Sequence, residues 1–137
     1  MKTLPGLVTA AALAALTPAF AQAPGKAAAS SAVQKEFEGF IGKFRAALKA
    51  NDPAAVAAMT RLPFQGDASV RDAAQFRAKV YAHDFTTKNR ACLQRVKPVY
   101  DRDGNNDETY HITCGELIFS FTRTPTGFLF TDLGAND

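Results

Sequence analysis

The chain has 137 residues and a formal net charge of +3, from 16 Lys and Arg against 13 Asp and Glu. Hydrophobic residues make up 47% and charged residues 21%, values of ordinary globular domains that exclude a disordered tail, a collagen-like repeat and a coiled coil. The length allows one domain with a hydrophobic core of its own.

Residues 1–21 have the features of a secretory signal peptide. Lys2 precedes a run of small and apolar residues, and Ala19-Phe20-Ala21 supplies the small residues that signal peptidase needs at its cut. The alternative is an N-terminal membrane anchor, which is disfavoured because the apolar stretch Leu4–Phe20 contains prolines and is mostly alanine. We therefore expect cleavage near Ala21 and no stable insertion into a membrane.

Cleavage there predicts an exported protein, periplasmic or secreted. Residues 22–31 are small and without pattern, and we interpret them as a flexible leader before a single domain over residues 32–137. No cysteine lies near the cut, which excludes a lipoprotein.

A long amphipathic helix is predicted to open the domain. Ser31 and Gln34 have the spacing of a capping box, with Ser31 as the N-cap. Gly39 and Gly42 weaken this helix, and close approach of another element would be one reason for them. The apolar residues that recur on one helical face are Phe37, Phe40, Ile41, Phe44 and Leu48.

Two shorter helices are predicted to follow. Asp52 as N-cap and Pro53 at the first helical position start a helix that runs to about Thr60. Leu62–Gln65 fits a short edge strand, and a third helix is expected over Asp72–His83.

The second half of the domain has the composition of β-strands. Asp101–Asp107 and Thr124–Gly127 are predicted hairpin turns, and Gly115 fits a β-bulge. Helices followed by an antiparallel sheet of about four strands define an α+β fold. The segments predicted as strands are Cys92–Tyr100, Thr109–Cys114, Glu116–Arg123 and Gly127–Leu133.

Cys92 and Cys114 are predicted to form a disulfide. They are the only cysteines of the chain, and an exported protein meets an oxidising compartment. If the turn Asp101–Asp107 centres near residue 103, the two cysteines lie opposite each other on paired strands. Closing a loop of this length contributes roughly 3 kcal/mol in the chain-entropy account. Two separate buried thiols are the alternative.

Several local features of the chain occur together in one superfamily of folds. They are the spacing Phe37-x-x-Phe40-x-x-x-Phe44, the helix start Asp52-Pro53, the tripeptide Leu62-Pro63-Phe64 and the hairpin Thr126-Gly127-Phe128. In this combination the chain resembles the nuclear-transport-factor-2-like superfamily, the cystatin-like α+β rolls, over nearly all of residues 32–134. The resemblance implies three N-terminal helices packed in the concavity of a curved antiparallel sheet, a cone with an apolar pocket.

This superfamily includes ketosteroid isomerases, polyketide cyclases, dehydratases and many small binding proteins without activity, so the fold alone does not choose a function. Members often dimerise through the sheet, which makes a homodimer of this kind one expectation. We expect the pocket to be lined by phenylalanines of the helices and strands, namely Phe37, Phe40, Phe44, Phe76, Phe119, Phe121 and Phe128.

No catalytic site with a defined pair of residues is predicted. Members that resemble ketosteroid isomerase use a carboxylate base and a tyrosine or acid that donates to an oxyanion in a dry pocket. Nothing in the spacing of this chain requires two such groups to meet, and the adjacent His83 and Asp84 diverge on a helix. The weak candidates are Tyr81, Asp84, Tyr110, His111 and Glu116.

A metal or cofactor site is not predicted either. Asp101–Asp107 places oxygen ligands at alternate positions, as at the start of a calcium loop, but Asn106 replaces the expected glycine and Ile112 the bidentate glutamate. A hairpin turn uses Asp, Gly and Asn for its own geometry. The chain has no phosphate-binding glycine loop and no Gly-x-Ser-x-Gly elbow.

Charge is unevenly distributed along the chain. Residues 22–70 carry six basic and four acidic residues, residues 71–102 eight and three, and residues 103–137 one and six. A dipolar surface of this kind steers anionic partners, although a charge run is most often a solvated face. Nucleic acid is a poor candidate, because the basic residues are not interleaved with aromatic ones and the protein is exported.

The leading hypothesis is a small exported binding protein without catalytic activity, which holds a hydrophobic small molecule or a protein partner in or beside the apolar pocket. One alternative is an isomerase- or cyclase-type enzyme that uses a pocket carboxylate with Tyr81 or Tyr110. Another is an accessory or inhibitor protein for a second exported protein. Ligand binding predicts a cavity of about 300 Å³ or more. A filled interior would count against it, and a purely aliphatic and phenyl lining would exclude the enzyme.

Overall fold

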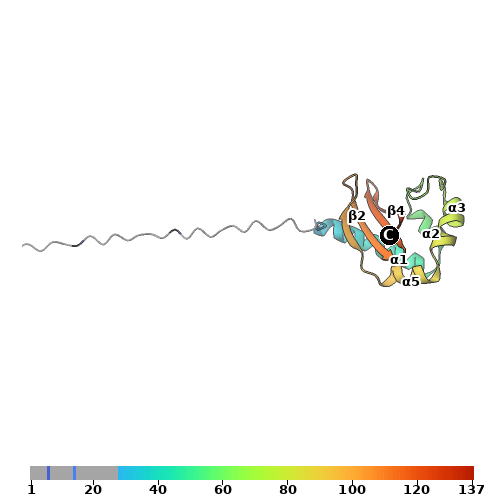
Figure 1. Ribbon diagram of the computed structural model, residues 1–137, viewed down its shortest axis with the longest axis horizontal. Coiled ribbons are helices and arrows are strands. Elements are labelled where there is room, and N and C mark those ends of the chain that lie inside the picture. Colours follow the sequence, from blue (N-terminus) through green and yellow to red (C-terminus); the bar gives the residue numbers. More distant parts are fainter. Residues whose placement is uncertain (1–5, 7–13, 15–27) are drawn as a thin grey trace, which may run out of the picture.

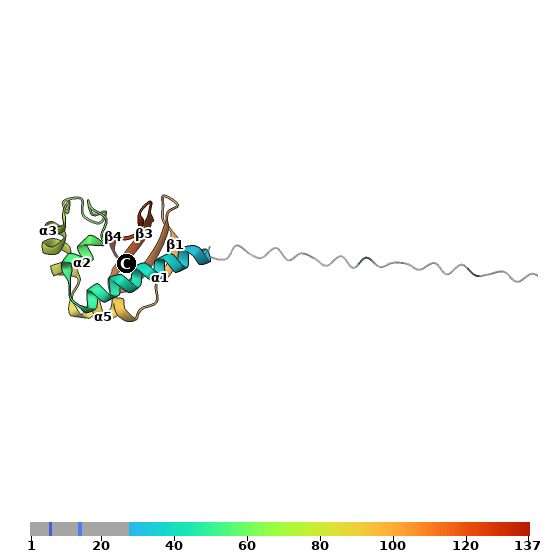
Figure 2. The same cartoon turned by 180° about the vertical axis from the view of Figure 1, so that it is seen from behind.

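The structure, a computed structural model, describes Gly6, Ala14 and residues 28–137. Most of the predicted signal peptide and leader therefore lie outside the described residues. In the described part, four helices precede a four-stranded antiparallel sheet (Figures 1 and 2). The predicted α+β class is confirmed.

Most of the elements follow one another with short connections, but a longer one, residues 59–72, joins α2 to α3. The third helix consists of three consecutive segments, of which η1 has π-helical hydrogen bonding. Among the described residues, no helix is long and apolar enough to span a membrane. The helices are α1 (Ser31–Lys49), α2 (Pro53–Ala58), the third helix with α3 (Ala73–Gln75), η1 (Phe76–Tyr81) and α4 (Ala82–Asp84), and α5 (Thr87–Arg95). The strands, in their order across the sheet, are β1 (Val99–Arg102), β2 (Glu108–Cys114), β3 (Leu117–Thr124) and β4 (Gly127–Ala135).

The long helix α1 packs across one face of the sheet, as Figure 2 shows from behind. Phe37 stacks on Tyr110 of β2 with ring centroids 3.8 Å apart, and Phe44 meets Phe121 of β3 at 5.0 Å. Tyr110 and Phe121 are cross-strand partners, and Phe121 pairs in turn with Phe130 of β4. One aromatic row of the sheet therefore faces the apolar stripe of α1.

The space between helices and sheet is filled by aromatic side chains. Phe85 illustrates the packing, with its ring 5.6 Å from that of Phe130 and 5.3 Å from that of Phe119. Such ring pairs contribute about 0.5–1.5 kcal/mol each beyond the area they bury. Core packing thus explains most of the phenylalanine content. The largest fully buried side chains in the described part are Phe44, Phe76, Phe119, Phe121 and Phe130.

The first helix begins one residue earlier than predicted. Ser30 is the N-cap, since the Val33 N–H donates to its hydroxyl at 3.3 Å, and Ser31 is already helical. The predicted cap at Ser31 is wrong because either of two adjacent serines has the side chain that a cap needs. The glycines predicted to allow close approach do not do so: a Cβ on Gly39 or Gly42 would meet no neighbour within 4 Å.

The predicted starts of the next two helices are confirmed. Asp52 caps α2 and accepts a hydrogen bond from the Ala55 N–H at 3.1 Å. Asp72 caps the third helix in the same way, accepting from the Gln75 N–H at 2.8 Å. A short carboxylate side chain before the first turn satisfies an amide that has no partner in the helix.

The predicted edge strand Leu62–Gln65 is wrong. Only Thr60 forms a bridge with Phe130 of β4, and this bridge is parallel. Beyond it the Phe64 N–H donates to the Val70 oxygen at 2.8 Å, which turns the chain back on itself instead of extending a ladder. The segment covers the β4 edge of the sheet as a loop.

The predicted strand Cys92–Tyr100 is also wrong, because its first residues, as far as Arg95, belong to α5 and β1 begins only at Val99. The hydroxyl of Thr86 accepts from the Asn89 N–H at 3.1 Å and so caps α5. Pro98 disfavours helical geometry in the residue before it, so the helix ends ahead of it.

The predicted disulfide between Cys92 and Cys114 is confirmed, with Cα atoms 5.9 Å apart. The predicted position of the two cysteines opposite each other on paired strands is wrong, because Val99 pairs with His111 and Cys92 lies on no strand. The bond instead joins α5 to the last residue of β2. Gly115 is not a bulge but part of the turn between β2 and β3, where it has a φ of 62°.

The hairpin predicted at Thr124–Gly127 is confirmed, since these two residues are the last pair of β3 and β4. The irregularity in this ladder lies elsewhere. The register shifts between Ser120 and Phe121, whose partners are Asp132 and Phe130, and this leaves Thr131 as the extra residue of a bulge.

Candidate binding groove

A groove of about 640 Å³ lies between α1, from Gln34 to Arg45, and the chain around β1. β1 is an edge strand of four residues, and β2, with which it pairs, has seven, so the sheet leaves part of α1 uncovered. The apolar walls are formed by Phe37, Ile41, Pro98, Val99, Tyr100 and Tyr110.

The floor of the groove is a set of interlocked rings. Tyr110 lies flat against Phe37, with an interplanar angle of 4°, and meets Tyr100 edge to face at 5.4 Å. Phe128 packs edge to face against both rings, with centroids 5.8 Å from that of Tyr110 and 5.1 Å from that of Phe37. Because the rings pack on one another, the floor exists before any ligand arrives.

The hydroxyl of Tyr110 has no hydrogen-bond partner among the described residues. The hydroxyls of Tyr81 and Tyr100 do have one, Asn51 at 2.8 Å and Glu108 at 3.3 Å respectively. Burial is the main reason that the pKa of Tyr110 is raised, followed by the nearby Tyr100, Glu108 and Glu38. The phenol is therefore neutral at neutral pH and is free to form a hydrogen bond with whatever occupies the groove.

Arg45 lies at the far end of the groove, and its guanidinium is hydrogen-bonded to backbone oxygens. Its Nε donates to the Leu93 oxygen at 2.8 Å and its Nη2 to the Val96 oxygen at 2.7 Å. Burial lowers the pKa of this guanidinium, which nevertheless remains charged at neutral pH. Arg45 thus fixes the end of α5, and with it the wall of the groove, against α1.

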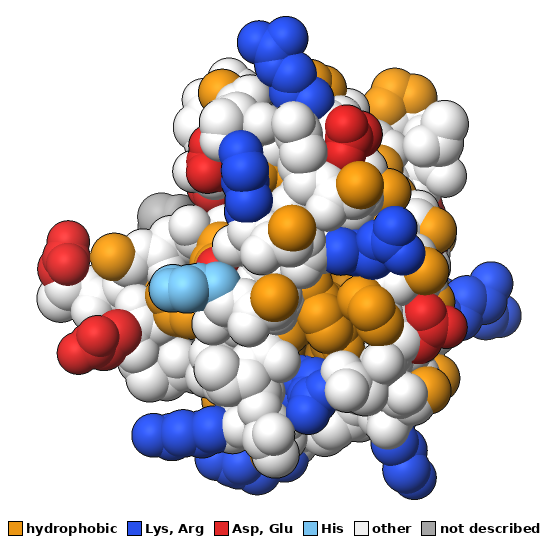
Figure 3. Space-filling view, turned by 90° about the vertical axis from the view of Figure 1, so that its right-hand side faces the viewer, with side chains coloured by type: hydrophobic (Ala, Val, Ile, Leu, Met, Phe, Trp, Pro, Cys, Tyr) orange, Lys and Arg blue, Asp and Glu red, His pale blue; other side chains and the backbone are white. Residues whose placement is uncertain are grey.

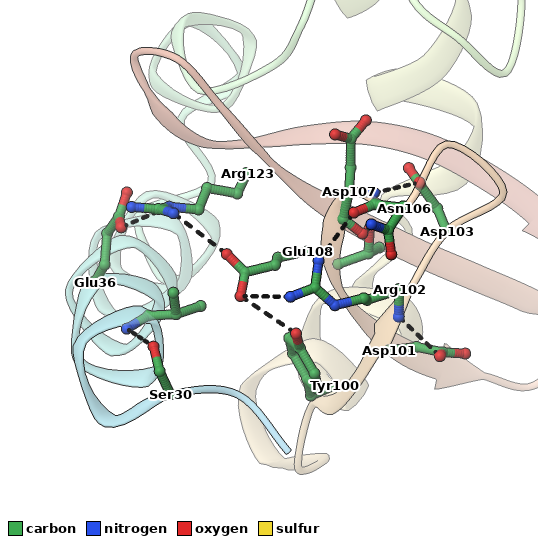
Figure 4. A network of polar contacts seen from close by, with 12 residues as sticks. Ser30, Glu36, Tyr100, Asp101, Arg102, Asp103, Asn106, Asp107, Glu108 and Arg123 are labelled. Carbon is green, nitrogen blue, oxygen red and sulfur yellow. Dashed lines mark hydrogen bonds and ion pairs between the residues drawn. The ribbon is translucent and has the colours of Figure 1, made fainter. Parts of the chain in front are cut away.

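A network of charged side chains braces the sheet beside the groove (Figure 4). Glu108 receives hydrogen bonds from Tyr100 and Arg123, both at 3.3 Å, and Arg102 lies 3.7 Å from it. Arg123 also donates to Glu36 of α1 at 2.9 Å. The network is largely exposed, so it orients Tyr100 and ties α1 to the sheet more than it adds stability.

The predicted pocket residues are brought together, but chiefly in the core. Phe37 lines the groove. Phe40 is partly buried against the core, and the remaining predicted residues are at most 3% exposed. These buried residues are Phe44, Phe76, Phe119, Phe121 and Phe128.

The weak catalytic candidates do not converge on one site. Tyr81 is buried and stacks on Phe85. The expectation that His83 and Asp84 diverge is wrong, because their side chains turn toward each other and meet at 2.8 Å, although His83 is exposed. His111 is hydrogen-bonded to Ser120 at 2.9 Å, one residue along β2 from Tyr110 and so on the opposite face of the sheet.

Of the other two candidates, Glu116 is exposed in a turn, and Tyr110 lines the groove. The groove also holds one carboxylate, that of Glu38, so its lining is not limited to aliphatic and phenyl groups. Glu38 is exposed, and its oxygen accepts from the Gln34 side chain at 3.3 Å.

The calcium-like turn uses its own side chains to hold its shape. The carboxylate of Asp103 accepts from the backbone N–H of Asn105 at 2.9 Å and of Asp107 at 2.8 Å. Asn106 has a φ of 63°, which asparagine tolerates. No group of three or more His, Cys, Asp or Glu side chains suited to a metal lies within the part of the chain that the structure describes.

The sequence reasoning missed Arg45, Val99 and Tyr100 as groove residues. A signal for Arg45 was present, since it follows Phe37 and Ile41 at intervals of four residues and so shares their helical face. Val99 and Tyr100 lay in a segment predicted as one long strand, which concealed that they begin an edge strand.

The basic residues of the middle segment are dispersed. Arg77 and Lys79 on η1 and Lys88 on α5 are exposed. Figure 3 shows the end of the molecule at the right of Figure 1, where α2 and α3 lie, with Lys and Arg side chains spread around its outline and hydrophobic ones nearer the middle. On this face the positive charges do not merge into one patch.

Comparison with known proteins found no match. The chain matches no protein-family model, no curated protein and no solved structure. The function is therefore argued from the groove itself.

Proposed function

We propose that this protein is a small, exported, non-catalytic binding protein and that the groove between α1 and β1 holds an apolar small molecule. One observation carries the proposal: a groove of about 640 Å³ with mainly apolar walls adjoins the aromatic core. Ligand sites typically measure about 300–1,000 Å³ and combine apolar walls with a few polar groups.

The broader setting is proposed with it. Export follows cleavage near Ala21, and the fold is of the nuclear-transport-factor-2-like kind, with helices in the concavity of a curved sheet. A homodimer through the sheet would leave the groove open, because the groove lies on the face where Phe37 and Tyr110 meet.

An enzyme of the isomerase or cyclase type is the weaker proposal. It needs a carboxylate in a dry pocket within reach of a tyrosine. Glu38 is the carboxylate that lines the groove, but it is exposed and so does not lie in a dry pocket. The role of an accessory or inhibitor protein would rest on charge alone.

The test is a titration of the chain that begins at Gln22 with N-phenyl-1-naphthylamine, a neutral probe that fluoresces in apolar surroundings. We expect saturable binding of one probe molecule per chain. Glu38→Trp should weaken it about tenfold or more, equivalent to roughly 1.4 kcal/mol. Glu38 lies on α1 and lines the groove, so the indole would occupy part of it, and because Glu38 is exposed the fold should tolerate the larger side chain.

Thr113→Trp is the matched control. Thr113 is exposed on β2 and lies on the face opposite Tyr110, so the added indole stays outside the groove. It should bind the probe as the unchanged chain does. Absence of saturable binding, or equal loss in both variants, would refute the proposed function.

A further inference from the structure

The groove is elongated and has two distinct ends. On α1 its lining extends from Gln34 to Arg45, a stretch of helix about 16 Å long, and the opposite wall is the segment from Lys97 to Tyr100. Arg45 donates to the Val96 oxygen at 2.7 Å, so the following residue, Lys97, lies at the Arg45 end of the groove. The wall therefore runs from this end toward the one where α1 begins.

The Arg45 end of the groove is positively charged. Arg45 and Lys97 both line it, and neither forms an ion pair with a carboxylate of the described residues. The Arg45 guanidinium donates from Nε and Nη2 to backbone oxygens, which leaves the N–H groups of Nη1 without a partner in the described part of the chain. Arg45 is half-buried beside apolar walls, and a charge in such surroundings is stabilised by an ion of opposite sign.

The other end of the groove carries a negative charge. Tyr100, the last residue of the wall, pairs with Tyr110, which stacks on Phe37 of α1. Glu38 follows Phe37 and also lines the groove. After burial, the main cause, the charge of Glu38 is one of those that raise the pKa of Tyr110, so this carboxylate lies near the phenol. Glu38 and Arg45 are two helical turns apart, roughly 10 Å, so an anionic group is repelled from one end and attracted to the other.

The lining between the two ends is apolar. Phe37 and Ile41 contribute to it from α1, and Pro98 contributes from the wall. Apolar surface of this kind binds the hydrocarbon part of a ligand by removing both from water. A ligand that matches the whole groove therefore has an apolar body and an anionic group at one of its ends.

We propose that the ligand of the groove is an amphipathic anion, of the class of medium-chain carboxylates, whose apolar body lies between α1 and the wall and whose anionic group is bound by Arg45 and Lys97. This proposal rests on the proposed function and adds the chemical class and the orientation of the ligand. Arg45 offers charged N–H donors in a fixed arrangement, and Lys97 adds an ammonium group on a flexible stem.

The experiment measures how decanoate, 1-decanol and decyltrimethylammonium displace N-phenyl-1-naphthylamine from the chain that begins at Gln22. The three compounds have comparable apolar chains and are an anion, a neutral molecule and a cation at neutral pH. Low ionic strength is used because salt screens exposed charges. We expect decanoate to bind about fivefold or more tightly than decanol, the upper range for an exposed ion pair, and the cation to bind most weakly.

Lys97→Glu tests where the anionic group binds. It should lower the ratio of the decanoate affinity to the decanol affinity about fivefold or more, because a negative charge replaces a positive one beside Arg45. Lys97 is exposed, so the fold should tolerate the change. Lys43→Glu is the matched control, since it alters the net charge equally at an exposed position of α1 that is not among the residues lining the groove. Its affinity ratio should equal that of the unchanged chain.

The outcomes separate this proposal from the proposed function. Saturable binding of N-phenyl-1-naphthylamine without a preference for decanoate overturns the anionic ligand alone. Tightest binding of the cation also overturns it, because the charged group of the ligand then belongs at Glu38. An equal fall of the affinity ratio in Lys97→Glu and Lys43→Glu does the same, since net charge then accounts for the preference. No saturable binding of N-phenyl-1-naphthylamine by the unchanged chain overturns the proposed function itself.

Discussion

The guanidinium of Arg45 donates a hydrogen bond of 2.7 Å to the backbone oxygen of Val96, the residue between α5 and the wall of the groove. It also bonds the Leu93 oxygen at 2.8 Å, one of the carbonyls that the end of a helix leaves without an amide partner. A positive charge at the C-terminal end of a helix also interacts favourably with the helix dipole. One side chain of α1 thereby ends α5 and positions the groove.

Arg45→Met is expected to lower the free energy of unfolding by about 2–3 kcal/mol and to weaken probe binding. The methionine keeps part of the apolar stem but leaves two carbonyl oxygens, partly shielded from water, without donors. Urea denaturation followed by circular dichroism measures the loss. Lys43→Met, at an exposed position of the same helix, should change stability by no more than about 0.5 kcal/mol. Similar losses in the two variants would contradict this role of Arg45.

The elements that the sequence predicted well are those determined by local pattern. The stripe of α1, the cap at Asp52 and the hairpin Thr124–Gly127 all follow from spacing within a few residues. α5 did not follow, because it is short and polar and buries only Cys92 and Leu93. Its position depends on partners distant in sequence, α1 and the end of β2, and local pattern does not encode them.

The groove was harder to predict than the fold. A sequence identifies apolar residues but not whether they fill a core or line an opening, since both need the same side chains. Phe37 does both, packing on Tyr110 and lining the groove, whereas Phe44 is fully buried. The opening exists because β1 is short and lies at the edge of the sheet. The length of β1 could not be predicted without α5, which occupies the first part of the segment predicted as one long strand.

Gly39→Ala is expected to stabilise the protein by about 0.5–1 kcal/mol, because alanine loses less backbone entropy in a helix. A Cβ at Gly39 would meet no neighbour within 4 Å. Gly66→Ala is the contrasting variant: its Cβ would lie 2.8 Å from the Asp132 carboxylate and 3.2 Å from the Leu133 backbone nitrogen. This crowding should cost about 1–3 kcal/mol. Thermal unfolding of both variants checks the opposite signs, and destabilisation by Gly39→Ala would show that α1 is packed more closely there.

The ionisation of the Tyr110 hydroxyl is expected to lower the free energy of unfolding at alkaline pH. Burial first, then Tyr100, Glu108 and Glu38, raise the pKa of its hydroxyl above the ordinary value of 10.0. The unfolded chain therefore releases this proton at a lower pH than the folded one, so the stabilisation is complete below about pH 10 and is lost as the pH rises through the folded-state pKa. Tyr110→Phe removes this contribution, and its free energy of unfolding should fall less steeply than that of the unchanged chain above about pH 10. Urea denaturation at a series of pH values measures both slopes, with Lys, Arg and Tyr100 as a common background. Equal slopes would mean that Tyr110 ionises as freely in the fold as in the unfolded chain.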